Sequence, residues 1–402
     1  MTTRQAERPP FVTPPREREP SLAERVAAVR PVLREEAADV DERARFPERA
    51  LAALRSSGLM GLLVPVEFGG LGGSLAEVAD VAAELAEECL STAMIWAMHC
   101  QQVAVLCDHT GPRLRARLLP RIGRGEVYVA SVTSEKGKGG HLLTANSPLR
   151  RTGETVHIER DAPIVTGGLH ADGFLITMRD SPDSPPNAVT LIYAERDDLT
   201  ITTSGSWNPL GMRGTHSVAM RLAGTVDAGN VVGEPGEFRT VAVARFIPAG
   251  HVAWAACWLG AARGALRAVL GLMRDPRGRG QFNFSSDLVR SRLARVRLDL
   301  DTVAALLGQV IAEVGAAGDP EAVPLQLRLN GLKILAAERC FEAVDSLIQL
   351  VGLRHGYMRD APAPLERLFR DLRSASLNYA NERLLLANGA LTLVDRDVTL
   401  SY

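Results

Sequence analysis

The middle of the chain differs in pattern from both of its flanks. Between residues 127 and 236, short runs rich in β-branched and aromatic residues alternate with Gly, Pro, Asn and Asp turns. This spacing is typical of an antiparallel barrel or sandwich and not of βαβ units. We expect strands at 127–133, 155–159, 173–178, 189–194, 199–203 and 218–222. The sequence therefore predicts a middle β domain over residues 127–236.

The two flanks have the apolar period of amphipathic helices. A disordered tail rich in Arg, Glu and Pro is predicted for residues 1–20, followed by an N-terminal helical domain over 21–126. Ser21 and Glu24 have the spacing of a capping box. In the C-terminal flank, 237–402, four long patterns predict an antiparallel four-helix bundle. Helices are expected at 47–57, 74–88, 91–108, 240–273, 286–314, 324–351 and 365–388. The predicted fold class is α+β, in the order helical, β, helical.

Charge and cysteine content argue against several functions. The formal net charge is −1, which gives no electrostatic reason to bind nucleic acid or an anionic membrane. The most apolar segment, 93–106, is interrupted by polar residues, so no membrane span is expected. The five cysteines form no C-x-x-C pair and suggest reduced thiols rather than disulfides or a metal site. We expect a cytoplasmic protein without a bound metal.

Four short motifs follow one another along the chain. They are P-V-E-F-G-G at 65–70, V-T-S-E-K-G-K-G-G-H at 132–141, L-G-M-R-G-T-H-S at 210–217 with N-V-V-G at 230–233, and P-L-E-R-L-F-R-D at 364–371. Each motif alone is a common turn or helix start. Together, in this order and spacing, they resemble the acyl-CoA dehydrogenase family. The resemblance covers nearly the whole chain after residue 20.

The resemblance implies an FAD site shared between subunits. Glycines of the 134–140 loop would let the backbone approach the flavin closely. Arg279 would reach the pyrophosphate bound in the neighbouring subunit, and Gln349 and Gly352 would meet the adenosine part. The expected FAD contacts are Ser134, Gly139, Gly140, Val165, Thr166, Arg279, Phe282, Gln349, Gly352 and Asn381. An FAD held in this way requires a homo-oligomer, either a dimer or a homotetramer.

The catalytic glutamate of the family is missing from both of its usual places. Most members have it eight residues after the R-D of the fourth motif, where this chain has Tyr379. Others have it at the start of the long helix that opens the C-terminal domain, where this chain has Gly250 followed by His251. Glu382, one turn after Tyr379 if this segment is helical, could be a displaced base. Alternatively, His251 or Tyr379 could supply other acid–base chemistry.

Several of these side chains also have a purely structural interpretation. Glu382 could lie on an exposed helix face, and His251 could be a packing residue in a buried helix. The resemblance implies that Trp96 and His99 lie near the substrate end of the site. Both could equally belong to the core.

The leading hypothesis from the sequence is FAD-dependent α,β-desaturation of an acyl thioester, carried by CoA or by a carrier protein. Electrons would pass to an electron-transfer flavoprotein. The first alternative is a two-component monooxygenase of the same fold, to which a flavin reductase supplies reduced flavin. The second is a catalytically inactive flavin-binding subunit. The completeness of the flavin motifs favours the first hypothesis, and the missing glutamate favours the alternatives.

Overall fold

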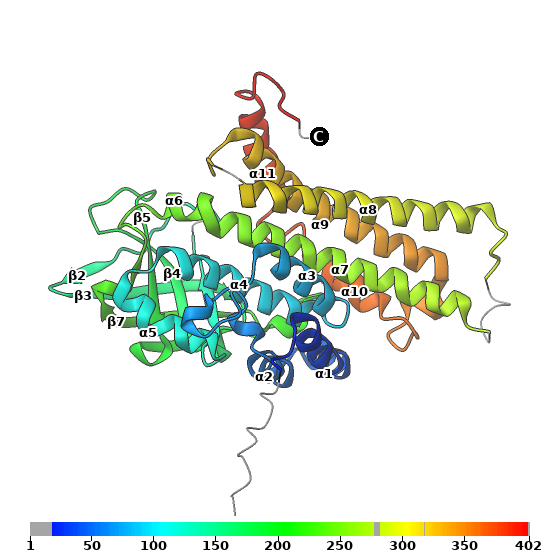
Figure 1. Ribbon diagram of the computed structural model, residues 1–402, viewed down its shortest axis with the longest axis horizontal. Helices are drawn as coiled ribbons and strands as arrows, with labels where there is room; N and C mark the ends of the chain where they lie inside the picture. Colours follow the sequence, from blue (N-terminus) through cyan, green and yellow to red (C-terminus); the bar gives the residue numbers. More distant parts are fainter. Residues whose placement is uncertain (1–17, 138, 277–281, 317, 401–402) are drawn as a thin grey trace, which may run out of the picture.

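In the computed structural model, the described residues are 18–137, 139–276, 282–316 and 318–400. Two sheets lie at one end of the molecule, and long helices extend from them to the other end (Figure 1). The first two helices pack on one side of this body, and the C-terminal helix projects from the opposite side. Of the predicted tail, only residues 18–20 are described, and they have no regular secondary structure.

The N-terminal domain is helical, as predicted. The predicted capping box is confirmed, because Ser21 Oγ accepts the Glu24 N–H at 3.3 Å and the Glu24 carboxylate accepts the Ser21 N–H at 2.7 Å. The domain contains α1 (Leu22–Arg43), α2 (Glu48–Ser56), α3 (Leu75–Ala86), α4 (Leu90–His109) and α5 (Pro112–Gly123), with 3-10 turns at Leu59–Gly61 and Val66–Phe68.

Two helical segments, α4 and residues 238–274, have the length and composition of a membrane span. In both, most of the apolar stretch (94% and 78%) is buried against other parts of the chain. Burial on all sides explains why these helices are apolar around their whole circumference. Core packing therefore accounts for both segments. From the sequence alone, neither was expected to be long and apolar enough to span a membrane.

The middle domain contains two four-stranded sheets. In the first the order is β1-β4-β5-β8, and in the second it is β2-β3-β7-β6. β1 and β4 are parallel, and the other pairs are antiparallel. The strands are β1 (Val129–Val132), β2 (Arg150–Thr152), β3 (Thr155–Val165), β4 (Gly173–Arg179), β5 (Val189–Glu195), β6 (Leu199–Ser204), β7 (Val218–Asp227) and β8 (Val231–Val232). All six expected strands are present. β2 and β8 were not predicted, because runs of two or three residues have no period to detect.

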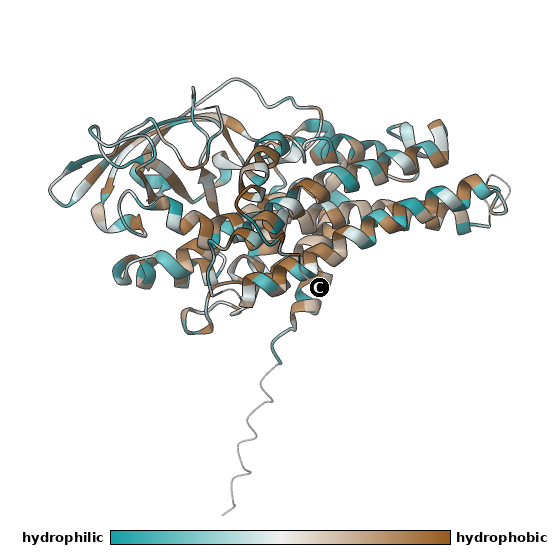
Figure 2. Ribbon diagram, turned by 90° about the horizontal axis from the view of Figure 1, so that it is seen from above, coloured by the Kyte–Doolittle hydropathy of each residue, from teal (hydrophilic) through white to brown (hydrophobic). Residues whose placement is uncertain are grey.

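The C-terminal domain is a helical bundle. Along its long helices, bands of apolar and polar residues alternate (Figure 2), as expected where one face packs against neighbours. α7 packs against α3 and α4 as well as against α8 and α9, so the two helical domains share one core. The elements are α6 (Phe238–Val241), a π-helical segment (Ala242–Phe246), α7 (Ile247–Arg274), α8 (Asp287–Ala316), α9 (Val323–Gly352), a second π-helical segment (Leu353–Tyr357), α10 (Leu365–Leu372) and α11 (Asn381–Thr392).

The last predicted helix, 365–388, is wrong as a single element. The chain forms α10, then turns over residues 373–380, and only then begins α11. Tyr379 has a φ of 53°, a left-handed conformation that no helix interior contains. After this turn α11 packs on α9, and Arg383 in its first turn reaches the Gly139 carbonyl oxygen.

The third and fourth motifs meet at the junction of the β domain and α10. Gly211 packs so closely on α10 that a Cβ at this position would lie 2.0 Å from the Arg370 carbonyl oxygen. The next residue, Met212, donates its N–H to the buried carboxyl of Asp371 at 2.5 Å. Arg370 forms an ion pair with Asp41 of α1 at 2.6 Å. Two motifs far apart in the sequence therefore hold three parts of the chain together.

Candidate functional site

A buried ion pair anchors the glycine-rich loop that follows β1. Arg160, on β3, pairs with Glu135 at 2.8 Å, and the two side chains are 0% and 4% exposed. The Glu135 carboxylate also accepts the N–H groups of Asn146 and Ser147 at 2.8 and 2.7 Å. Burial alone would raise the pKa of Glu135, but Arg160 and these hydrogen bonds lower it below its usual value. The carboxylate therefore fixes both ends of the segment between residues 135 and 147.

The loop itself is open to solvent. Gly137, Gly139 and Gly140 have positive φ angles of 79°, 65° and 78°, which side chains rarely allow. Ser134, at the start of the loop, donates its hydroxyl to the Ile164 carbonyl oxygen at 2.7 Å. The exposed backbone of the loop is thus tied to the end of β3.

The end of β3 brings hydroxyl groups to this loop. Val165 is fully buried, whereas Thr166 is half-buried. The Ser217 hydroxyl lies 3.1 Å from that of Thr166 and 2.9 Å from that of Thr215. Between them His216 is left-handed, with a φ of 44°, and its Nδ1 is buried without a hydrogen-bond partner in the described structure. The third motif therefore supplies a polar edge next to the predicted loop.

The C-terminal segment closes on the same loop. Arg383, in the first turn of α11, donates to the Gly139 carbonyl oxygen, and its guanidinium lies within 4 Å of the position that a Cβ on Gly140 would take. Tyr379 is half-buried and packs against both apolar cores of the molecule. The structure thus brings together five predicted site residues in the loop and at the end of β3: Ser134, Gly139, Gly140, Val165 and Thr166.

Asn381 and Glu382 differ from the sequence expectation. Asn381 is buried, and its side chain bonds with Lys333 at 2.7 Å and Glu338 at 3.2 Å. Glu382 is exposed in the first turn of α11. Because α11 begins only at Asn381, Glu382 does not follow Tyr379 by one helical turn. The helical geometry that would make Glu382 a displaced base is therefore absent.

The second usual position of the glutamate has no room for a side chain. A Cβ on Gly250 would lie 2.2 Å from Nε2 of Gln101. That amide is fixed, because it donates to the Phe246 carbonyl oxygen at 2.8 Å. The packing of α4 against α7 thus requires glycine at this position.

His251 is a buried neighbour of Tyr379. The two rings are 6.0 Å apart, and His251 Nδ1 lies 3.3 Å from the Leu329 carbonyl oxygen, which makes Nδ1 the protonated nitrogen. Burial, with a contribution from Lys333, lowers the pKa of His251 to about 3, so it is neutral at pH 7. Burial also raises the pKa of Tyr379. Both groups are neutral hydrogen-bonding groups at this pH.

We predict that His251 makes the fold acid-sensitive. Its folded pKa lies below the ordinary value of 6.5, so below pH 6.5 the unfolded chain binds a proton that the folded chain does not. Stability is therefore lost as pH falls from 6.5 towards 3, by about 1.4 kcal/mol per pH unit. His251→Asn should flatten the pH dependence of urea unfolding in this range, whereas the exposed His157→Asn should not. Equal slopes in all three proteins would contradict this prediction.

Trp96 and His99 are core residues and not surface-accessible contacts. Both are 0% exposed. The Trp96 indole donates to the Leu59 carbonyl oxygen at 3.0 Å. His99 accepts the Val129 N–H at 3.1 Å and donates to the Met60 carbonyl oxygen at 2.9 Å. Their polar groups have partners within the protein, so both side chains stabilise the core, and their contact with substrate stays a prediction.

The remaining predicted FAD contacts lie elsewhere. The Phe282 ring is tilted by 58° against the His355 ring, with ring centroids 5.6 Å apart. Gln349 is exposed and donates to Asp345 at 2.7 Å, and Gly352 ends α9 with a φ of 73°. The C-terminal end of α9, which holds Gln349 and Gly352, lies at the end of the bundle remote from the sheets (Figure 1). Arg279 lies outside the described residues.

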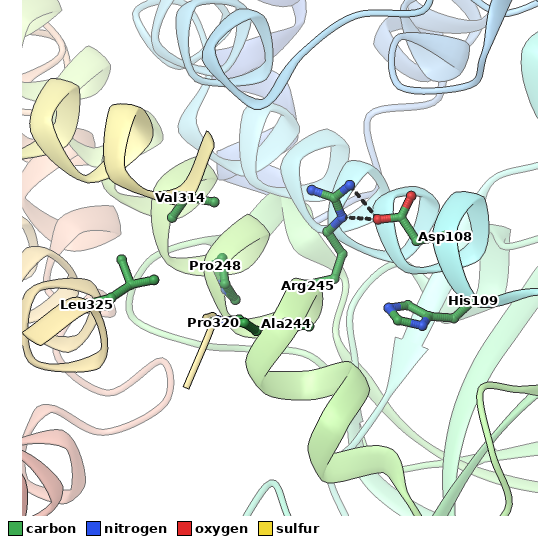
Figure 3. Close-up of a pocket in the computed structure, with 8 residues that line it drawn as sticks. All are labelled: Asp108, His109, Ala244, Arg245, Pro248, Val314, Pro320 and Leu325. Carbon is green, nitrogen blue, oxygen red and sulfur yellow. Dashed lines mark hydrogen bonds and ion pairs between the residues drawn. The ribbon is translucent and has the colours of Figure 1, made fainter. Parts of the chain in front are cut away.

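A pocket of about 280 Å³ opens beside α7 (Figure 3). Arg245 and Asp108 form an ion pair at its rim, and His109 lies next to them. Its apolar side includes Pro248 and Leu325. Each of these two lies one helical turn before a member of the His251–Leu329 hydrogen bond, and neither member of that bond lines the pocket.

The family comparison agrees with this arrangement of parts. The profile described as acyl-CoA dehydrogenase, N-terminal domain, matches residues 20–126, and that described as acyl-CoA dehydrogenase, C-terminal domain, matches residues 240–378. The chain belongs to the acyl-CoA dehydrogenase family. It is a flavin oxidoreductase of the acyl-CoA dehydrogenase type.

Two curated relatives illustrate the range of reactions among similar proteins. A probable acyl-CoA dehydrogenase of Mycobacterium tuberculosis is 25% identical over 84% of this chain and 85% of its own length. The L-evernosamine nitrososynthase of a Micromonospora species is 29% identical over 94% of this chain and 91% of its own length. Similarity to known sequences therefore includes both dehydrogenation and nitrogen oxidation.

Solved structures show the same fold. TdsC from Paenibacillus sp. A11-2, in its FMN-bound form, superposes with a TM-score of 0.82 at 22% identity, over 93% of this chain and 98% of that one. It is described as a dibenzothiophene monooxygenase. At this identity the likeness concerns the fold.

The residues of this acyl-CoA dehydrogenase family member fit a flavin. At Gly137 nothing lies within 4 Å of a Cβ position, and at Gly139 and Gly140 the only side chain that close is Arg383, so the described glycines of this loop leave backbone groups open to a ligand. His216 Nδ1 and one terminal nitrogen of Arg383 are buried without hydrogen-bond partners in the described structure. Unpaired buried donors and acceptors of this kind are costly unless a ligand satisfies them.

Proposed function

We propose that this protein is a flavin-dependent monooxygenase that acts on a nucleophilic nitrogen of a small molecule, such as an amino sugar. An amine, dioxygen and reduced flavin would give a hydroxylamine, water and oxidised flavin. The bound flavin supplies the two electrons that accompany cleavage of the O–O bond. A separate reductase would regenerate it.

One observation carries this proposal: neither usual position of the dehydrogenase base holds a carboxylate. Tyr379 stands at one position, and Gly250 stands at the other with its Cβ space filled by Gln101. Desaturation of a thioester needs a base to remove the α-proton. Oxygenation of an amine uses the lone pair of the substrate and needs no such base.

The surroundings of Tyr379 also suit an oxygenation. Its phenol and the His251 ring are neutral and can orient a substrate by hydrogen bonding. His251 is buried and hydrogen-bonded to α9, which keeps water from this side of the site. The match to the nitrososynthase covers 94% of the chain at 29% identity, compared with 84% at 25% for the probable dehydrogenase.

Desaturation of an acyl thioester is the second candidate. It is favoured by the names of many relatives, including a short-chain acyl-CoA dehydrogenase of Clostridium acetobutylicum. In this chain Glu382 would have to act as the base, although it is exposed and lies outside the helical turn that would align it with Tyr379. Its electron acceptor would be an electron-transfer flavoprotein.

Turnover distinguishes the two reactions. The protein would be incubated aerobically with a flavin reductase, NADH, flavin and a panel of amino sugars and their nucleotide conjugates. We expect hydroxylamine or further N-oxidised products. In parallel, anaerobic mixing of the flavin-loaded protein with acyl-CoA esters should leave the flavin oxidised. Bleaching by a thioester that is lost in Glu382→Gln would overturn the proposal in favour of desaturation.

We assign the pocket at Arg245 and Pro248 to the substrate, because Pro248 lies one turn before His251 on α7 and the pocket combines a charged rim with an apolar wall. An anionic group on the substrate, such as a phosphate, could compete with Asp108 for the Arg245 guanidinium. The sugar or acyl part would then lie towards Tyr379.

The proposed flavin is FAD, held between two copies of the chain in the cytoplasm. Near Gln349, the side chains of Leu353, Tyr357 and Met358 are 70%, 63% and 51% exposed, as expected if a second subunit covers them. FMN lacks the adenosine part that Gln349 and Gly352 would contact.

We therefore predict that Gln349→Ala weakens FAD binding and leaves FMN binding unchanged. The loss of one hydrogen bond to the ligand should raise the dissociation constant for FAD about tenfold. Glu342→Ala, an exposed substitution on the same helix, is the matched control. Equal affinity of wild type and Gln349→Ala for FAD, measured by flavin fluorescence, would count against the assigned adenosine contact.

A further inference from the structure

Lysine is rare in this chain. Of the 46 basic residues, only Lys136, Lys138 and Lys333 are lysines, and the others are arginines. The first two belong to the second motif, whose loop forms one side of the flavin site. Lys333 lies on α9 and is fully buried. Lysine differs from arginine in carrying a compact ammonium group on a flexible stem instead of a planar guanidinium.

Lys333 reaches from α9 to both ends of the turn between α10 and α11. Its Nζ donates to the Ala375 carbonyl oxygen at 3.0 Å and to Asn381 Oδ1 at 2.7 Å. The Trp258 ring lies 5.5 Å away, in the geometry of a cation–π contact. Within the described residues, no carboxylate forms an ion pair with Lys333. Its two hydrogen bonds therefore both go to uncharged groups of the turn, the Ala375 carbonyl and the Asn381 amide.

The turn that Lys333 binds is strained. Between Ala375 and Asn381 it contains Tyr379, whose φ is 53°. For a residue with a bulky side chain this conformation costs on the order of 1–2 kcal/mol. The Asn381 N–H donates to the Ser376 carbonyl oxygen at 3.0 Å and closes the turn. Lys333 holds the same turn from α9. The surrounding contacts therefore hold Tyr379 in place.

The amide of Asn381 extends the contact to the surface. Its Nδ2 donates to the exposed Glu338 at 3.2 Å while its Oδ1 accepts from Lys333. The amide is thus oriented from both sides. Burial lowers the pKa of Lys333 to about 7, and Glu338 opposes this shift. A buried ammonium group is unfavourable unless it is hydrogen-bonded. The bonds to Ala375 and Asn381 offset this cost.

We propose that Lys333 is a positioning residue of the flavin site, which clamps the 375–381 turn so that Arg383 faces the Gly139–Gly140 backbone and Tyr379 stays beside His251. The inference rests on the proposed flavin site and not on the reaction, because it concerns binding and local order. The clamp acts through Ala375 and Asn381. Lys333 itself touches neither flavin nor substrate.

The test uses Lys333→Met, which keeps the length of the side chain and removes its donors. Leu332→Met, a buried substitution on the same helix, is the matched control. Two quantities are measured for each protein: the dissociation constant for FMN, by fluorescence, and amide hydrogen exchange, by mass spectrometry. In Lys333→Met we expect an FMN dissociation constant at least about tenfold higher and faster exchange of peptides covering 374–381. Peptides from the centre of α8 should remain protected.

The outcomes separate a clamp from a general packing role. If Lys333→Met lowers the melting temperature but leaves FMN affinity and exchange of 374–381 as in Leu332→Met, the clamp is disproved. If Lys333→Met does not fold, Glu338→Ala tests the same contact from the surface, and it should show smaller changes in the same direction. No change in Glu338→Ala would then disprove the clamp. If the wild-type protein binds no flavin, the proposed function fails, whereas hydrogen exchange still tests the clamp.

Discussion

Arg160→Met is expected to destabilise the protein by roughly 3–5 kcal/mol, because it leaves the buried carboxylate of Glu135 without its partner. Both side chains are nearly inaccessible to water, so solvent cannot replace the guanidinium. Flavin affinity should fall as well, since Glu135 fixes both ends of the loop that carries Gly139 and Gly140. The measurements are urea unfolding, which reports the free energy, and FMN fluorescence.

The pH dependence and two further variants test this account of Arg160. An unpaired buried carboxyl has a raised pKa, so the deficit should grow as pH rises above its ordinary value of 4.5. Arg160→Met combined with Glu135→Gln should recover part of the loss. Arg221→Met breaks the exposed pair with Glu159 and should cost less than about 1 kcal/mol. A loss that small in Arg160→Met would refute the structural role of the pair.

Gly211→Ala is expected to cost about 3 kcal/mol or more, at or above the upper end of ordinary overpacking. Its Cβ would lie 2.0 Å from the Arg370 carbonyl oxygen and 2.5 Å from the Asp371 nitrogen. These are backbone atoms, which cannot rotate away as a side chain can. α10 would have to move, which would break the bond from the Met212 N–H to the Asp371 carboxyl.

Gly308→Ala is the same substitution at an open position, and we expect it to raise stability instead of lowering it. Gly308 lies within α8, and nothing lies within 4 Å of its Cβ position. Alanine should therefore stabilise the helix by roughly 0.5–1 kcal/mol. The two urea midpoints should move in opposite directions. A Gly211→Ala protein as stable as the wild type would contradict the close contact between the third and fourth motifs.

Much of the architecture can be predicted from sequence periodicity and turn residues. The Ser21–Glu24 capping box and six of the strands depend on residues close together in the sequence. Residue spacing and turn residues therefore predict them. The break before α11 has only a weak local signal, because residues 373–380 contain Ser and Asn but neither glycine nor proline. The contacts from Lys333 on another helix are tertiary and leave no mark on the local pattern.

The site was only partly predictable, for physical reasons. The resemblance located Ser134, Gly139 and Thr166, which the structure brings together. It could not show the Arg160–Glu135 pair, which depends on how β3 lies behind the loop. For Trp96 the helical pattern could not distinguish core from pocket, because α4 is buried on nearly all sides. Hydrophobic periodicity could not single out Lys333 either, because the pattern does not distinguish lysine from the arginines that form nearly all of the basic residues.

The origin of the product's oxygen tests the central claim most directly. The protein would turn over an amine substrate with a flavin reductase and NADH under isotopically labelled dioxygen, and mass spectrometry would follow the product. We predict a nitrogen-oxidised product that carries label from dioxygen, and no desaturated thioester in parallel reactions. Formation of an α,β-unsaturated thioester in the absence of dioxygen, with no oxygen transfer to any amine, would contradict the account.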